Sequence, residues 1–157
     1  MRPLEHFLIQ FNVRKLDLGN NILFVEDNKF FLITREMQNT IKKTKKPFYA
    51  GNYLGKARGK KFFPSVSLLN MTKSRTSHKI WIDSKTEWLF VCGRDLFASG
   101  IRKSSYNAQK NTIALVLNPN NEVIGFGKVT KSLKEKGVVV QNILDIGDFL
   151  RRERKKK

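Results

Sequence analysis

Short runs of β-forming residues follow one another closely in the second half of the chain, and they restrict its fold more than any other feature. Five such runs occupy residues 79–82, 87–92, 112–117, 123–130 and 138–141. An Asn-Pro-Asn-Asn segment at 118–121 supplies a turn between the third run and the fourth. Short strands at close spacing, with little helix between them, favour a small barrel. We therefore expect a β-barrel in this half of the chain.

The first half alternates between helix and strand patterns. Four apolar residues recur at helical spacing and predict a short amphipathic helix: Leu4, Phe7, Leu8 and Phe11. Residues 22–26 and 29–34 are β-rich, and Asp27-Asn28 between them suits a tight hairpin turn. We further predict a helix over 35–43, a strand over 48–54, a loop through Gly51, Gly55 and Gly59, and a short helix over 64–71. This half is therefore of the α+β class.

The polar segment 72–77 has no periodicity and suits a linker, so we expect two domains, over residues 1–76 and 77–157. We find no internal repeat between the halves. At 157 residues and 40% apolar content, the chain is long enough to build a real core.

Local patterns in the second half predict three further features. The apolar run 88–92 indicates a buried strand that holds Cys92 as a small core residue. Because Cys92 is the single cysteine, an internal disulfide is excluded. Gly125 and Gly127 are typical of a bend at a barrel corner. Asp145 is placed to cap a last helix that runs through the basic residues at the end of the chain.

Positive charge is concentrated in two segments. Residues 37–82 hold eleven Lys and Arg and no Asp or Glu, and residues 151–157 hold six basic residues and one acidic residue. Together they account for most of the formal net charge of +18. Charge segregated in this way repels itself in a compact state unless a polyanion neutralises it. Nucleic acid is therefore the first candidate partner.

A membrane surface is the alternative polyanion, since anionic lipid also attracts clustered Lys and Arg. The basic segments lack a long amphipathic helix that would insert beside the charges. The chain also has no apolar run of spanning length and no apolar signal-peptide core. We expect a cytoplasmic protein that does not bind membranes.

Catalytic and metal-binding patterns are weak. The two histidines, His6 and His78, have no second ligand at metal-binding spacing, so we predict neither a metal site nor a His-based triad. The segment from Gly51 to Lys56 resembles a P-loop, but it has three residues between its glycines, where four are needed, and Ala57 after the lysine. We predict no nucleotide, no cofactor and no enzymatic activity. A glycine-rich loop with Lys56, Arg58, Lys60 and Lys61 can still approach a phosphate chain.

Three motifs in the second half carry a resemblance to a known family. They are Gly93-Arg-Asp-Leu-Phe-Ala-Ser-Gly-Ile101, Ile124-Gly-Phe-Gly127 with Lys131-Ser132 after it, and Asp145-Ile-Gly-Asp-Phe-Leu-Arg-Arg-Glu153. In this order and spacing they resemble the PUA domain of the Nip-seven family of ribosome-biogenesis factors. The match extends loosely upstream to Met1-Arg-Pro-Leu4 and covers essentially the whole chain. Since the chain is shorter than eukaryotic members, mainly in its first half, we expect the archaeal type.

The resemblance implies an N-terminal α/β domain with an antiparallel sheet, followed by a PUA-type β pseudobarrel that binds RNA. It implies a non-catalytic role in pre-rRNA processing and large-subunit assembly, with assembly factors and the exosome as partners. It also implies a preference for U-rich single strands, contacted by basic residues near the C-terminus. We expect the protein to act as a monomer.

These considerations give one set of candidate RNA-binding residues. The C-terminal ones are Arg151, Arg152, Arg154 and Lys155, where arginine binds phosphate bidentately and stacks on bases. The others are Lys131, Arg102, Lys56, Arg58, Lys60 and Lys61. Two alternatives stay open: a PUA-containing RNA-modification protein, and an adaptor that links assembly factors or the exosome to RNA. Whether the basic segment 37–82 contacts RNA is a separate question.

Overall fold

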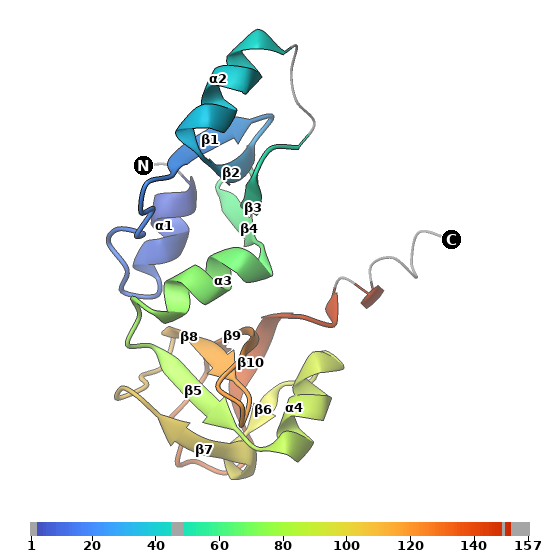
Figure 1. Ribbon diagram of the computed structural model, residues 1–157. Helices are drawn as coiled ribbons and strands as arrows, with labels where there is room; N and C mark the ends of the chain where they lie inside the picture. The colour runs from blue at the N-terminus through green and yellow to red at the C-terminus, as the bar shows by residue number, and fades with distance from the viewer. Residues whose placement is uncertain (1–2, 45–48, 149, 152–157) are drawn as a thin grey trace. The chain divides into compact units, whose positions relative to one another are not determined.

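The computed structural model describes residues 3–44, 49–148 and 150–151, and Figure 1 shows the order of its elements. The chain separates into two compact units. The first holds the chain up to Ile9 and Val13–Arg75, and the second holds Gln10–Asn12 and the chain from Thr76 onward. Most of each unit is one continuous stretch, but three residues from the beginning of the chain belong to the second unit.

The first unit is built on an antiparallel sheet with the strand order β1-β2-β3-β4. Its strands are β1 (Ile22–Glu26), β2 (Lys29–Ile33), β3 (Asn52–Arg58) and β4 (Lys61–Pro64). Asp27 and Asn28 both adopt positive φ, 47° and 62°, which is the backbone that a tight hairpin turn requires. The predicted hairpin is therefore confirmed.

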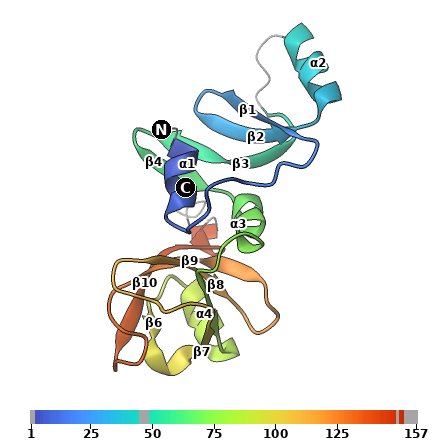
Figure 2. The ribbon, with the colours of Figure 1, turned by 90° about the vertical axis from the view of Figure 1, so that its left-hand side faces the viewer.

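Three helices complete the first unit: α1 (Pro3–Ile9), α2 (Arg35–Lys43) and α3 (Val66–Lys73). Helix α1 packs on one face of the sheet, where the Phe7 and Phe30 rings lie 5.6 and 5.2 Å from the Phe62 ring. Helix α2 contributes Met37 and Ile41 to a cluster around Phe31 and Ile33, on the other face (Figure 2). The predictions of α1 and α2 are confirmed, and α3 begins two residues later than predicted.

The prediction for the glycine-rich segment was wrong at Gly55. We expected a strand over 48–54 and a loop through Gly51, Gly55 and Gly59; β3 starts at Asn52 and continues through Gly55 to Arg58, while Gly51 and Gly59 lie in a bend and a turn outside it. Gly55 has a φ of +146°, and a Cβ there would lie 2.4 Å from the carbonyl oxygen of Phe63. Glycine therefore permits close strand pairing at this position, and flexibility is not its role.

The second unit is built on a six-stranded sheet with the order β6-β10-β9-β8-β5-β7, which curls into a half-barrel. Its strands are β5 (Lys79–Ile82), β6 (Leu96–Phe97), β7 (Ile101–Ser104), β8 (Ile113–Leu117), β9 (Val123–Val129) and β10 (Val138–Asp145). Neighbouring strands are antiparallel except β5 and β8. Its core includes Ile80, Phe90, Leu96, Val116 and Val139. The predicted α+β fold with a PUA-type pseudobarrel is confirmed.

A bulge interrupts the pairing of β8 with β9, where the register shifts between Val116 and Leu117. Gly125 pairs with Val116 at this shift, and a Cβ on Gly125 would lie 2.1 Å from the carbonyl oxygen of Leu144. Glycine is therefore required for steric reasons at the bend that the sequence predicts in the Gly125-Phe-Gly127 segment.

Two predictions for the second unit were wrong. Residues 87–92 do not form a buried strand, because Ser84–Val91 is helix α4 and Cys92 is an exposed free cysteine at its C-terminal end. Asp145 does not cap a helix, because it is the last residue of β10. Residues 148, 150 and 151 are helical, in line with the predicted final helix, and residues 149 and 152–155 lie outside the described ranges.

Candidate nucleic-acid interface

The motif at residues 93–101 follows α4 and forms β6 and the 3-10 helix η1 (Ala98–Gly100). Helix α4 begins at this site because its N-cap, Asp83, accepts a hydrogen bond of 2.7 Å from the Thr86 backbone amide. Together these elements line a depression of about 380 Å³. Its lining residues are Asp83, Lys85, Thr86, Leu89, Asp95, Phe97, Ser99 and Gly100. We call this depression the motif pocket.

The motif pocket offers one open aromatic ring and one cation. Phe97 is 55% exposed, although it lies in a strand and pairs with Val138. Leu89 is 43% exposed beside it, and Lys85 is exposed on the first turn of α4. An exposed ring next to a lysine can stack on a base and contact its phosphate.

The two carboxylates of the motif pocket are engaged by other groups. Asp83 also forms an ion pair with Arg102, with 3.1 Å between Oδ2 and Nη2, and the hydrogen bonds from Thr86 hold its pKa below the ordinary value. Asp95 accepts a 2.9 Å hydrogen bond from the Asn142 backbone amide. These contacts hold both carboxylates to the fold.

Of two further predicted residues, Arg102 lies beside the motif pocket, and Lys131 is joined to the adjoining 3-10 helix η1 through the backbone of residues 136–137. Arg102 reaches it through the ion pair with Asp83. Lys131 donates to the carbonyl of Lys136 at 2.6 Å, and the next residue, Gly137, accepts a hydrogen bond from Ala98 in η1. The half-barrel therefore brings together residues that are far apart in the sequence.

Arg151 is held by the fold. Its Nη1 donates to the Val91 carbonyl at 2.5 Å, and its Nη2 donates to Asp145 Oδ2 at 2.7 Å. The Asp145 side chain is 2% exposed, and the Arg151 side chain is 38% exposed. The hydrogen bond to Asp145, with the charge of Asp148 nearby, raises the pKa of Arg151 above its ordinary value. Arg151 therefore anchors the C-terminal segment to the end of α4.

The sequence did not reveal this anchor or its third member, Asn142. The Asn142 amide nitrogen donates to Asp145 Oδ2 at 3.1 Å and to the Phe90 carbonyl at 2.9 Å. A signal was present, since Asp145 and Arg151 lie in one motif, six residues apart. From the sequence, however, Asp145 was expected to cap a helix and Arg151 to contact RNA. The predicted residues Arg152, Arg154 and Lys155 lie outside the described ranges.

The remaining predicted residues come together in the first unit. Lys56 and Arg58 lie on β3, Lys61 begins β4, and Lys60 lies in the turn between these strands. They are therefore at the two sides and the tip of one hairpin. They are not part of the motif pocket, whose lining belongs to the second unit.

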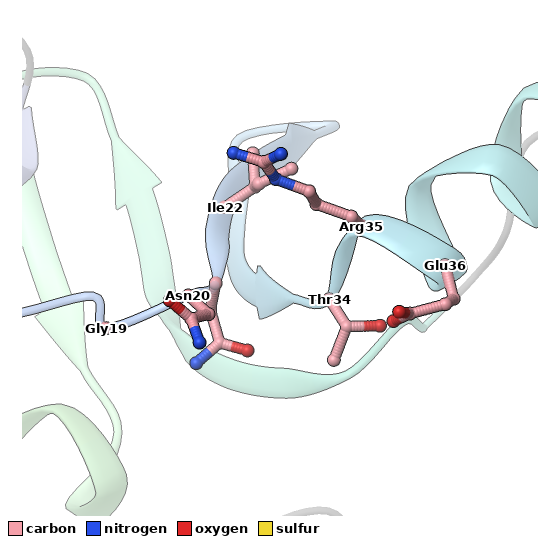
Figure 3. Close-up of a pocket in the computed structure, with 7 residues that line it drawn as sticks. Gly19, Asn20, Ile22, Thr34, Arg35 and Glu36 are labelled. Carbon is pink, nitrogen blue, oxygen red and sulfur yellow. The ribbon is translucent and has the colours of Figure 1, made fainter.

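A second depression, of about 530 Å³, lies where β1 and α2 begin (Figure 3). The Thr34 hydroxyl accepts a hydrogen bond from the Met37 amide and so caps α2. Glu36 has a lowered pKa because it accepts hydrogen bonds from Thr34 and from its own backbone amide. This depression contains Arg35 but none of the predicted RNA-binding residues.

No group of three or more His, Cys, Asp or Glu side chains in residues 3–44, 49–148 and 150–151 is arranged to hold a metal ion. No helix in these ranges combines the length and the apolar character that crossing a membrane requires.

Comparisons with known proteins identify the second unit. Residues 78–154 match the family described as the UPF0113 PUA domain. A UPF0113 protein of Archaeoglobus fulgidus is 31% identical over 114 residues, which is 69% of this chain and 64% of that protein. A 60S ribosome subunit biogenesis protein NIP7 homolog of Dictyostelium discoideum is 25% identical over 99 residues, which is 59% of this chain and 55% of that protein. The chain therefore spans less than two thirds of the length of these relatives.

The fold is also similar to a solved structure. A conserved PUA domain protein from Thermoplasma acidophilum has a TM-score of 0.62 at 19% identity, over 98% of this chain and 96% of that one. At this identity the likeness establishes the fold alone. The sequence matches, rather than this likeness, confirm the resemblance to the Nip-seven family with its PUA domain, and residues 78–154 are the part of the chain that matches the UPF0113 PUA domain.

Proposed function

We propose that this protein is an RNA-binding ribosome-biogenesis factor that acts through its PUA unit and without catalysis. The observation that carries the proposal is the PUA fold at residues 78–154 in a chain of formal net charge +18. The name of the Dictyostelium discoideum relative, a 60S ribosome subunit biogenesis protein, supports the same process. The proposed ligand is pre-rRNA, bound at U-rich single-stranded segments.

The motif pocket is the proposed centre of contact. A base stacks on Phe97, and Lys85, Lys131 and Arg102 contact the flanking phosphates. Arg151 positions the C-terminal segment, whose Arg152, Arg154 and Lys155 extend the phosphate contacts. The protein acts in the cytoplasm as a monomer in pre-rRNA processing and large-subunit assembly. Assembly factors and exosome subunits are the proposed protein partners.

Fluorescence anisotropy with a labelled U-rich RNA tests the pocket in the full chain. We expect Phe97→Ala to weaken binding about tenfold, since stacking contributes about 1–3 kcal/mol per base. Ile143→Ala is the matched control, because Ile143 is a 46% exposed apolar residue of β10 that does not line the motif pocket. Equal affinities of the two variants would exclude stacking on Phe97.

A salt titration of the unmodified protein tests the phosphate contacts separately. For a single strand, log K falls by about 0.7 per unit of log salt for each phosphate contact. Several phosphate contacts therefore predict that log K falls by about 3 or more for each unit of log salt. A slope below about 1 would exclude the electrostatic mechanism.

A further inference from the structure

The open face of the four-stranded sheet carries aromatic and basic residues in adjacent rows. Residues directly opposite one another on neighbouring strands share a face. One row is Phe24, Phe31 and Tyr53, across β1, β2 and β3. The next is Lys29, Lys56 and Phe63, across β2, β3 and β4. The last, nearest the β3–β4 turn, is Arg58 opposite Lys61.

This face is opposite to the one that α1 covers. Phe62, which contacts α1, alternates with Phe63 along β4, so the two rings point to opposite sides. Helix α2 packs at the other end of the open face, beside Ile33. The rows that contain Tyr53, Lys56 and Arg58 lie between α2 and the β3–β4 turn.

The aromatic side chains on this face leave ring surface in solvent. Tyr49 is 60% exposed, and its ring lies 5.2 Å from the Phe31 ring and 6.0 Å from the Tyr53 ring. Phe63 is 36% exposed at the opposite edge of the sheet. Phe31 is buried and its ring packs against the Tyr49 ring, so the exposed Tyr49 ring is held in place by the core of the sheet.

Arg58 joins the aromatic rows to the basic ones. Its guanidinium carbon lies 5.5 Å from the centre of the Phe63 ring, within the range of a cation–π contact. Burial, with a smaller contribution from Tyr49, raises the pKa of Tyr53 above its ordinary value, and the positive charge of Arg58 opposes that rise. Glu26, paired with Lys29 at the β1 edge, adds one negative charge far from Arg58.

We propose that this face is a second RNA-binding surface, on which single-stranded RNA stacks bases on Tyr49 and Phe63 while Lys56, Arg58 and Lys61 contact its phosphates. Flat exposed rings alternating with cations suit a chain that alternates bases with phosphates. The charge is complementary to RNA, since residues 37–82 contain eleven basic and no acidic residues. The inference rests on the proposed function for the choice of RNA, but not on the motif pocket.

Two variants of the full chain test the surface. Arg58→Glu reverses the charge of the cation that contacts Phe63, and Tyr49→Ala removes the more exposed of the two proposed stacking rings without changing charge. We expect anisotropy with the labelled U-rich RNA to show about tenfold weaker binding for Arg58→Glu and about fivefold for Tyr49→Ala. Arg14→Glu is the matched control, because it makes the same charge change at an exposed position outside these rows.

The outcomes separate this inference from the proposed function. If Phe97→Ala weakens binding while Arg58→Glu and Tyr49→Ala match Arg14→Glu, the second surface is excluded and the PUA site stands. If the sheet variants alone weaken binding, the sheet inference stands and the motif pocket is wrong. If the unmodified protein binds no RNA, both fail. Displacement of the RNA by polyglutamate at equal charge concentration would show a site for acidic polypeptide and overturn the proposal.

Discussion

At the scale of single residues, the sequence shows where a basic side chain is, but not whether that side chain is free to contact RNA or is paired within the fold. Arg151 is in the cluster that charge counting favoured for RNA, but its guanidinium is bound to the Val91 carbonyl and to a buried carboxylate. Arg102 also pairs with Asp83, although its side chain stays 67% exposed. These pairings join residues six and nineteen positions apart, and they depend on tertiary structure that composition does not contain. The sequence therefore predicted which segments are basic, but not which side chains remain open.

We predict that Arg151→Ala lowers the free energy of unfolding by about 1–3 kcal/mol, because it leaves the Asp145 carboxylate buried without its cation. Urea denaturation of the full chain measures this. Asp145→Asn in the same background is the control, since the neutral amide no longer needs the arginine. If Arg151→Ala lowers the free energy of unfolding equally in the Asp145→Asn background, loss of the ion pair does not cause the destabilisation.

At the scale of elements, helix α4 shows why an apolar run is ambiguous. Residues 88–92 predicted a buried strand, yet Trp88 and Leu89 of α4 are 70% and 43% exposed and Phe90 alone of its residues is buried. Short apolar runs do not distinguish strand from helix, so the flanking signal has to decide. That signal was Asp83, an N-cap immediately before Ser84. The β1–β2 hairpin was predictable because its Asp-Asn turn is itself a local signal.

We predict that Asp83→Ala lowers the free energy of unfolding at neutral pH by about 1 kcal/mol, the usual value of an N-cap. The pKa of Asp83 is lowered in the folded protein, so its stabilisation is present above the ordinary value of 3.8 and is lost as pH falls through the lower folded value. Denaturation at a series of pH values measures this difference.

Asp83→Asn is the control for the charge. Asparagine keeps the capping hydrogen bond but does not ionise, so its stability relative to Asp83→Ala should not change across the same acidic range. If Asp83→Asn and the unmodified protein lost stability in parallel below pH 4, the titration of Asp83 would not contribute.

At the scale of the whole molecule, the sequence predicted the α+β class and the barrel of the second half, since both follow from local periodicity. It could not predict the parallel pairing of β5 with β8, which joins Ile80 to Val116. Nor could it show that the basic residues of β3 and β4 share a face with Tyr53 and Phe63, because a bulge between Phe30 and Phe31 sets that register.

The second unit includes Gln10–Asn12, so it cannot be cut from the chain as one piece. Phe11 is fully buried, its ring lies 5.6 Å from the Phe126 ring, and its carbonyl accepts a 2.6 Å hydrogen bond from the Thr76 hydroxyl. We predict that a fragment of residues 77–157 unfolds at lower urea concentration than the full chain, because Phe126 loses its cover. Phe11→Ala in the full chain should reproduce part of that loss, and equal midpoints for fragment and full chain would show the early segment to be dispensable. Any shortened form of this protein therefore has to keep those early residues if Phe126 is to stay covered.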